Sequence, residues 1–159
     1  MSILIPVVST GVTLNEVPGQ IAFYVEIGEC NKHCHGCHSP HLWKHVQHKT
    51  SLEDLLRKIL DAKEEGADAV VLMGGTTNGL TEGTLMSIIQ SISCILPVAL
   101  YSGSDNMDKD MKYLTKTDLT WLKTGSYKEK LGGLKDPNTN QRFFVKKNGK
   151  IKEMTEVFQ

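Results

Sequence analysis

The sequence predicts an α/β fold: a single domain, built as an open or incomplete (β/α) barrel around a mostly parallel sheet of roughly five or six strands. Short apolar runs alternate with segments whose apolar residues recur at helical spacing, and this order is typical of a parallel sheet. The chain has 159 residues, whereas a closed eight-fold barrel needs about 250, so we expect the barrel to stay open. Residues 1–159 are therefore expected to form one domain.

The first expected strand, Ile21–Ile27, is rich in β-branched and aromatic residues and follows a turn at Pro18-Gly19. A helix is expected next, because Thr50-Ser51-Leu52-Glu53 has the capping-box pattern and Gly66 can cap the C-terminus. The remaining expected elements are a buried strand at Ala69–Met73, a helix from Thr81 to about Ser93, a strand at Leu96–Tyr101, a polar helix over Asp105–Leu114, a weaker strand at Leu119–Lys123 and a last strand at Arg142–Val145.

Glycines follow the ends of several expected strands. Gly74-Gly75, Ser102-Gly103 and Thr124-Gly125 each follow a strand, and a cysteine-rich loop follows Ile21–Ile27. Because the carboxyl ends of parallel strands lie at the same edge of a sheet, we expect these loops to converge and to carry the chemistry.

The charge balance gives no global attraction to nucleic acid or to a membrane, since Lys+Arg and Asp+Glu each number 18. The last part of the chain is locally basic, with ten basic and five acidic residues from Thr115 to Gln159. A solvated lysine-rich face is the common reason for such a bias, and a partner with an acidic surface is the alternative. No apolar run approaches the length of a membrane span, and no signal peptide is recognisable.

Three cysteines, Cys30, Cys34 and Cys37, occupy one short loop with the spacing CxxxCxxC. Three thiolates can hold three irons of a four-iron, four-sulfur cluster and leave the fourth iron open, whereas an electron-carrying cluster normally has four thiolates. Zinc is the structural alternative, because one nearby histidine would complete a closed Cys3His site. Cys94 lies in an apolar stretch and is expected to be a buried small hydrophobe. Cysteines grouped three plus one do not resemble a disulfide framework, so we expect a cytoplasmic protein.

Two further patterns have both a structural and a functional interpretation. His38, His41, His45 and His48 recur at three- and four-residue intervals, which suits a mixed polar helix face more often than a metal patch. Among them, His38 directly follows a cluster cysteine and is expected near the cofactor. The pair Gly74-Gly75 is either a plain loop or a place where a small ligand lies against main-chain atoms.

These residues resemble the radical S-adenosylmethionine superfamily and, within it, the activating enzyme of the anaerobic (class III) ribonucleotide reductase. The resemblance extends from about Gln20 to Phe144. Its strongest parts are the cysteine loop, the strand end Leu100-Tyr101-Ser102-Gly103 and the run from Leu122 to Phe144, which ends in Thr-Asn-Gln-Arg-Phe-Phe.

The resemblance implies two cofactors and the residues that hold them. Cys30, Cys34 and Cys37 would bind a 4Fe-4S cluster, and the open iron would take the amino and carboxylate groups of S-adenosylmethionine. Gly74 and Gly75 would contact the methionine amino group through their backbone. His38, Thr76 and Ser102 complete the candidate cofactor-binding residues, and no catalytic side chain is expected beyond the cluster and the cofactor.

The resemblance also implies a reaction. One electron from the reduced cluster would cleave S-adenosylmethionine into methionine and a 5′-deoxyadenosyl radical, which would take a hydrogen atom from a glycine of the reductase. The expected partners are the large subunit of anaerobic ribonucleotide reductase, which is a glycyl radical enzyme, and a one-electron donor such as flavodoxin. No nucleic acid and no membrane are expected.

The sequence departs from the family at the glycine motif, where Thr76 and Thr77 follow in place of the usual acidic residue. A threonine hydroxyl can accept a hydrogen bond but brings no charge, so Asp105 or another carboxylate is a candidate to compensate. A side chain added at Gly75 is expected to block the cofactor.

Two rival functions stay open: a radical S-adenosylmethionine enzyme for a small molecule, and a zinc-binding interaction module. An incomplete barrel leaves one side of its site open, and a macromolecular substrate could cover that opening. This consideration favours the activating enzyme over an enzyme for a small molecule.

Overall fold

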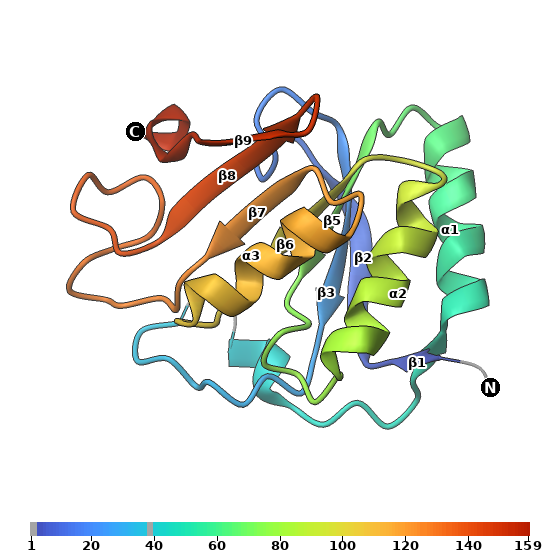
Figure 1. Ribbon diagram of the computed structural model, residues 1–159. Helices are drawn as coiled ribbons and strands as arrows, with labels where there is room; N and C mark the ends of the chain where they lie inside the picture. The colour runs from blue at the N-terminus through green and yellow to red at the C-terminus, as the bar shows by residue number, and fades with distance from the viewer. Residues whose placement is uncertain (1–2, 38–39) are drawn as a thin grey trace.

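A seven-stranded mixed sheet with three helices on one face forms the body of the protein (Figure 1). The computed structural model describes residues 3–37 and 40–159. Its strands are β1 (Leu4–Ile5), β2 (Val7–Thr13), β3 (Ala22–Ile27), β4 (Thr50–Ser51), β5 (Ala69–Met73), β6 (Val98–Tyr101), β7 (Trp121–Thr124), β8 (Arg142–Lys147) and β9 (Lys150–Glu153). Its helices are α1 (Leu52–Glu64), α2 (Glu82–Ser93) and α3 (Met107–Lys116), with short 3-10 helices η1 (Pro40–Trp43) and η2 (Thr155–Phe158).

The strands of the large sheet lie in the order β2-β3-β5-β6-β7-β8-β9. The central pairs β3–β5, β5–β6 and β6–β7 are parallel, and the pairs on either side of them are antiparallel. The α/β class is thus confirmed, and the sheet is mixed, with seven strands where five or six were expected. Closure into an incomplete barrel stays a prediction.

The two additional strands of the large sheet have compositions that hide them in the sequence. Strand β2, VVSTGVT, is half-exposed and rich in small hydroxylated residues, and β9, KIKE, is exposed along its whole length. Each is an outer strand of the sheet, with only one neighbour. Their strand conformation therefore comes from backbone pairing with the neighbouring strand, and no pattern of apolar side chains indicates it.

Each of the three α-helices begins at a residue whose side chain caps the first turn, and for α1 this residue is one position later than expected. Ser51, not Thr50, caps α1: its hydroxyl accepts the backbone N–H of Asp54 at 3.2 Å. Gly66 follows that helix with a φ of 113°, which an L-residue rarely adopts. Thr81 caps α2 as predicted, and α3 begins at Met107, two residues later than the start expected at Asp105.

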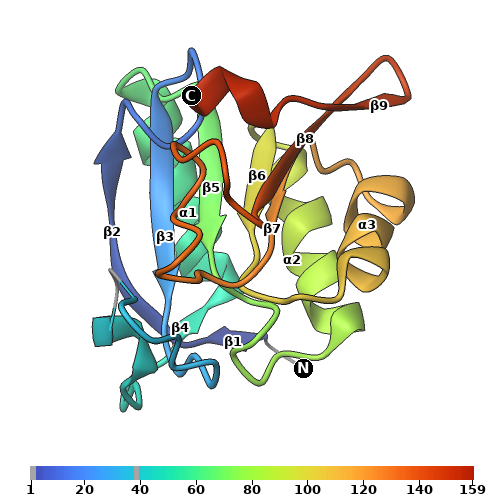
Figure 2. The ribbon, with the colours of Figure 1, turned by 90° about the vertical axis from the view of Figure 1, so that its left-hand side faces the viewer.

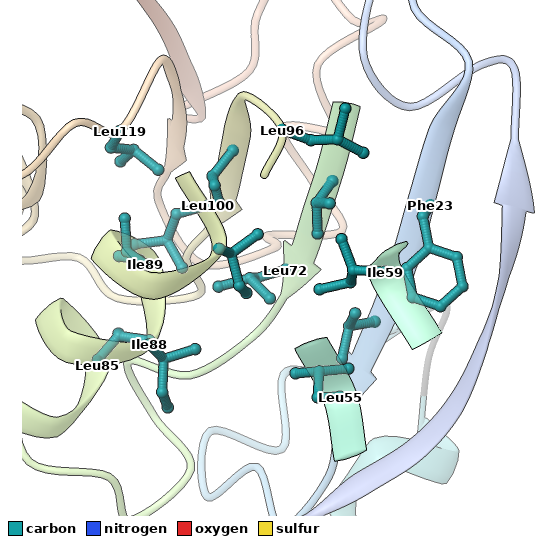
Figure 3. Packing of buried hydrophobic residues seen from close by; sticks show 14 of the residues in the cluster. Phe23, Leu55, Ile59, Leu72, Leu85, Ile88, Ile89, Leu96, Leu100 and Leu119 are labelled. Carbon is teal, nitrogen blue, oxygen red and sulfur yellow. The ribbon is translucent and has the colours of Figure 1, made fainter. Parts of the chain in front are cut away.

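The helix-covered face of the sheet holds the larger part of the core. Val25, Leu72, Leu100 and Leu122 are paired across four neighbouring strands, and each is fully buried. Figure 3 shows Leu72 and Leu100 against side chains of α1 and α2, which contribute Leu55, Ile59, Leu85, Ile88 and Ile89. Burial of one such side chain stabilises the fold by about 1.5–3 kcal/mol.

The opposite face of the sheet carries smaller residues. Ala22, Ala69 and Ala99 are fully buried there, in a cluster with Val71 and Phe143. Figure 2 shows the segment between β7 and β8, together with η2, crossing this face on the side away from the helices. Because the alanines fill little space, the crossing segment can leave room above the sheet.

Two sequence-based interpretations are wrong. Cys94 is exposed at the C-terminal cap of α2, because the apolar residues around it are used by the helix and the next strand while its own side chain faces outward. His41, His45 and His48 do not share a helix face, since only the four residues of η1 are helical in this region. His38 lies outside the described residues. No helix among the described residues combines the length and the apolar character needed to cross a membrane.

Candidate functional site

The last paired positions of the four parallel strands place Glu26, Met73, Tyr101 and Lys123 next to one another across the sheet. Side chains alternate along a strand, so these residues face away from the helices, whereas their neighbours Val25, Leu72, Leu100 and Leu122 face the core. Met73, Tyr101 and Lys123 form part of the wall of a cavity of about 520 Å³. This cavity lies where the sequence predicted that the strand-end loops would converge.

All three cysteines of the predicted cluster motif line this cavity. Cys30, Cys34 and Cys37 are half-buried and lie on the loop that continues directly from β3. Glu29, His33 and Gly36 have φ values of 60°, 47° and 72°, so the backbone reverses direction several times within a few residues. The N–H of Cys37 donates to the carbonyl of Cys34 at 3.0 Å and closes the last of these turns.

Neighbouring segments hold the cysteine loop mainly through its backbone. The N–H of Cys30 donates to the carbonyl of Leu42 at 2.8 Å, and that of Asn31 donates to the carbonyl of Thr77 at 2.9 Å. The ring of His33 stacks on Trp43 with centroids 4.6 Å apart. The Cys30 sulfur also lies 3.1 Å from the Thr77 hydroxyl, so Thr77 is the threonine that contacts the cysteine loop.

The donor set fits a four-iron, four-sulfur cluster. Three half-exposed thiols of one short loop face one cavity, and each would bind a different iron. Such thiolates surround a cluster and do not meet at one point. Within residues 3–37 and 40–159, no three Cys, His, Asp or Glu side chains converge as a single-ion site requires.

Gly74 and Gly75 have similar backbone angles but different surroundings. Their φ values are 109° and 119°, and Gly74 lines the cavity. Gly75 is buried, and a Cβ built on it would lie 3.0 Å from Leu85 of α2. A side chain at Gly75 would therefore press on the core, and the expectation that it would block the cavity is not supported by this geometry.

Asn78 connects the glycine loop to the end of β3, and no sequence pattern had distinguished it from its neighbours. Its side chain accepts the N–H of Gly75 at 2.7 Å and donates to the carbonyls of Ile27 and Gly28 at 3.0 and 2.5 Å. Asn78 is 3% exposed, so these bonds are buried. One side-chain amide thus fixes the glycine loop relative to the end of β3, where the cysteine loop begins.

The hydroxyls of Thr76 and Ser102 lie 2.7 Å apart at the ends of β5 and β6. Ser102 lines the cavity and is 1% exposed, and its hydroxyl also accepts the N–H of Ser104 at 3.0 Å. The structure therefore brings together Cys30, Cys34, Cys37, Gly74 and Ser102 around the cavity, with Thr76 in contact with Ser102.

The cavity wall also contains Tyr101, which is buried, and Lys123, which is half-buried. Burial raises the pKa of Tyr101, and its hydroxyl donates to the backbone carbonyl of Glu16. The Lys123 ammonium lies 5.2 Å from the centre of the Tyr101 ring. Burial lowers the pKa of Lys123, while the Glu16 carboxylate acts in the opposite direction. Both residues follow a buried leucine, Leu100 or Leu122, and the alternation of side chains along a strand places them on the opposite face.

Polar contacts connect the cysteine loop to the segments that follow β6 and β7. Lys32 lies 3.5 Å from Asp105, and His35 lies 3.0 Å from Glu129. Asp105 accepts the N–H and the hydroxyl of Ser126, and the Ser126 N–H is the main reason why the pKa of Asp105 is lowered. Asp105 thus has partners of its own and is not part of the cavity wall.

The run that ends in Thr-Asn-Gln-Arg-Phe-Phe supports the strand end after β7. Asn140 donates to the carbonyl of Ser126 at 3.1 Å, and Gln141 donates to the carbonyl of Gly125 at 3.2 Å. Gln141 also lines the cavity, together with Leu134 and Phe158 of the crossing segment and η2. Residues from this part of the chain and from the cysteine loop therefore line the same cavity.

A family model described as "4Fe-4S single cluster domain" matches residues 18–142. The matched range includes the cysteine loop, the Gly74–Asn78 loop and all four parallel strands. The comparison with curated proteins finds no match, and neither does the comparison with solved structures.

Proposed function

The chain belongs to the family of 4Fe-4S single cluster domains, and from this premise we propose that it is a radical S-adenosylmethionine activating enzyme. In this proposal it generates a 5′-deoxyadenosyl radical and installs a glycyl radical on anaerobic ribonucleoside-triphosphate reductase. The family accounts for the cluster alone. The observation that carries the rest is the common cavity of three cysteines, Gly74 and Ser102.

The size and the lining of the cavity support a second ligand beside the cluster. A volume of about 520 Å³ lies within the range of small-molecule sites, about 300–1,000 Å³. Apolar side chains such as Ile27, Met73 and Leu134 stand beside polar groups at the strand ends. This mixture suits S-adenosylmethionine, in which a sulfonium joins an adenosyl group to a methionine chain that ends in an amino and a carboxylate group.

When bound, the cluster would supply the electron that cleaves S-adenosylmethionine. The residues of the protein would hold the cluster and S-adenosylmethionine and enclose them. Cys30, Cys34 and Cys37 would hold the irons, and the backbone of Gly74 would lie against the methionine end of the cofactor. The wall formed by Gln141, Leu134 and Phe158 would keep water away from the reacting carbon.

The proposed partners are the large reductase subunit and a one-electron donor such as flavodoxin. A glycine of the reductase must come within van der Waals distance of the cofactor, so a loop of that protein must enter the cavity. The crossing segment between β7 and β8 covers the face on which the cavity lies (Figure 2). Contact with the reductase is therefore expected at this segment, which carries Lys128, Lys130 and Lys135.

The test is an electron paramagnetic resonance spectrum of the large reductase subunit after anaerobic incubation with this protein, S-adenosylmethionine and reductant. We expect the doublet of a glycyl radical, and no doublet from a reductase whose radical-bearing glycine is replaced by alanine. Cofactor cleavage without a radical on the reductase would favour a small-molecule substrate. A colourless protein that holds stoichiometric zinc would favour the interaction module and overturn the proposal.

A further inference from the structure

A second cavity borders the cysteine loop, and the proposed function has so far given it no role. Its volume is about 320 Å³, at the low end of the range of small-molecule sites. Three of the six residues that line it carry aromatic rings, and the six are Glu29, Cys30, Asn31, His33, Trp43 and His45. Because Asn31, His33 and His45 are exposed, this second cavity opens to solvent.

Cys30 and Trp43 line both cavities, whereas Cys34 and Cys37 line the first alone. Main-chain hydrogen bonds hold Trp43 beside Cys30. The N–H of Cys30 donates to the carbonyl of Leu42 at 2.8 Å, and the N–H of Glu29 donates to the carbonyl of Lys44 at 3.2 Å. The residues on either side of Trp43 are thus bonded to the start of the cysteine loop, and Cys30 and Trp43 form the wall between the two cavities.

This position matters because the cluster must receive an electron from outside the protein. In the proposed function, on which this inference rests, the cluster, S-adenosylmethionine and a loop of the reductase share the first cavity. A donor therefore needs a different approach to the cluster. Electron transfer slows steeply with distance, so the donor must come close to a cluster ligand. Among the three cysteines, Cys30 is the one that the second cavity exposes.

The aromatic wall of the second cavity suits a planar donor group. The rings of His33 and Trp43 are stacked, with centroids 4.6 Å apart and an angle of 19° between their planes. A flat conjugated ring packs well against such aromatic side chains. The small volume fits one ring system and not a whole nucleotide, so the ring has to be presented by a protein that holds the remainder.

The charge around the second cavity suits an acidic protein. Residues 29–49 contain three lysines and all six histidines of the chain, and Glu29 is the one acidic residue among them. Glu29 is itself paired with His45 at 2.9 Å and with Lys49 at 3.8 Å. A positively charged surface of this kind steers and orients a partner of opposite charge.

We propose that the second cavity is the docking site of an acidic electron-donor protein, whose reduced flavin ring packs against Trp43 and His33. The flavin passes one electron to the cluster past Cys30. In this step the anionic hydroquinone of the flavin loses one electron and keeps its proton, and the oxidised cluster gains that electron. No other bond forms or breaks, and no further reactant is needed.

The test follows electron transfer alone, without S-adenosylmethionine and without the reductase. Cluster-loaded full-length protein is mixed anaerobically with an excess of reduced flavodoxin, an acidic protein that carries a flavin. The second-order rate constant is taken from the absorption band of the one-electron-oxidised flavin that forms. Reduction by dithionite, a small inorganic reductant, shows in each variant that the cluster is present and reducible.

Trp43→Ala should lower the rate constant with flavodoxin about two- to tenfold, as for the loss of one aromatic pair, and leave the rate with dithionite unchanged. A reduced ferredoxin is also acidic but presents no flat ring, so Trp43→Ala should not slow it. Equal slowing with ferredoxin would overturn the assignment of a flavin. An unchanged rate with flavodoxin in cluster-loaded Trp43→Ala would overturn the docking site.

Lys44→Glu tests the charge, and it decides the matter if Trp43→Ala fails to hold its cluster. Lys44 is exposed next to Trp43, so its reversal should slow flavodoxin about threefold at low salt and less at high salt. Lys58→Glu is the matched control, because it reverses an exposed lysine of α1 and should have little effect. Equal slowing by both variants would show that net charge alone matters and would overturn the docking site. A protein that flavodoxin reduces as expected but that cleaves no S-adenosylmethionine would instead overturn the proposed function.

Discussion

The cysteine loop and the Gly74–Asn78 loop lie side by side at one edge of the sheet, but they are held in different ways. The glycine loop is fixed by the buried amide of Asn78, which bonds to both neighbouring strand ends. The cysteine loop relies on backbone bonds to Leu42 and Thr77 and on ion pairs at the surface. The conformation of the glycine loop is therefore fixed by the folded protein itself. We expect the cysteine loop to reach its final conformation only when its ligand binds.

The largest expected effect concerns the cysteine loop. Cys30→Ala, Cys34→Ala and Cys37→Ala should each lose most of the bound iron and sulfide, because each removes one of only three protein ligands. The apoprotein fold should persist, since none of these side chains belongs to the core clusters. Iron and acid-labile sulfide analysis after anaerobic reconstitution, with thermal unfolding of the apoprotein, measures both effects.

Cys94→Ser is the matched control, because Cys94 is exposed at the end of α2 and far from the loop in sequence. It should retain full iron content. If a cysteine variant of the loop also retained it, that cysteine would not be a ligand. If all three variants failed to fold, the comparison between the two loops would be wrong.

The next effect concerns the glycine loop and should appear in stability. Gly75→Val introduces a β-branched side chain at a φ of 119° and against Leu85 of α2. Backbone strain of this kind costs on the order of 1–3 kcal/mol, and core overpacking typically costs about as much. Chemical denaturation should show this loss in the apoprotein. Gly79→Val is the control, since Gly79 also has a positive φ, 80°, but open space around it; an equal loss there would mean that crowding by Leu85 is irrelevant.

The smallest effect concerns the ion pair between Lys32 and Asp105. The pKa of Asp105 is lowered in the folded state by the Ser126 N–H, by the Ser126 hydroxyl and by Lys32, so this carboxylate stabilises the fold at pH values above its unfolded pKa. The contribution is lost as the pH falls through the lowered folded pKa. Because Asp105 is partly exposed, we expect less than about 1 kcal/mol.

Thermal unfolding of Asp105→Asn and wild type at several pH values measures this contribution. The two midpoints should differ at pH 7 and converge in acid, once the pH has fallen below the lowered folded pKa of Asp105. A difference that stays constant into acid would show that the side chain acts by its shape and not by its charge. Both proteins should be compared as apoproteins, so that cluster loss does not contribute.

The central strands were predictable because their residues are apolar at successive positions, as in a strand that is buried on both faces. Ala69–Met73 reads as a buried strand at every position, and the loops that follow such strands must share an edge. The cysteine spacing likewise identified residues that the structure places around one cavity. By contrast, β9 has no apolar face, and its strand character comes from pairing with β8 alone.

Long-range contacts explain most of what the sequence did not predict in the site. Asn78 is one polar residue among several in its loop. It connects two loops only because the fold brings the carbonyls of Ile27 and Gly28 within hydrogen-bond distance. Asp110 resembles its neighbour Asp108 in the sequence, yet the turn of α3 buries one and exposes the other. Gly74 and Gly75 are identical in type, and their different surroundings depend on α2.

The stacking of Trp43 on His33 gives this protein an optical reporter of its own. The chain has two tryptophans, and the other, Trp121, lies in β7 on the sheet. Because His33 stands between two of the cysteines, any movement of the loop changes the surroundings of the Trp43 indole. In a Trp121→Phe background, emission from Trp43 would follow the ordering of the loop in real time, without a label and before any chemistry takes place.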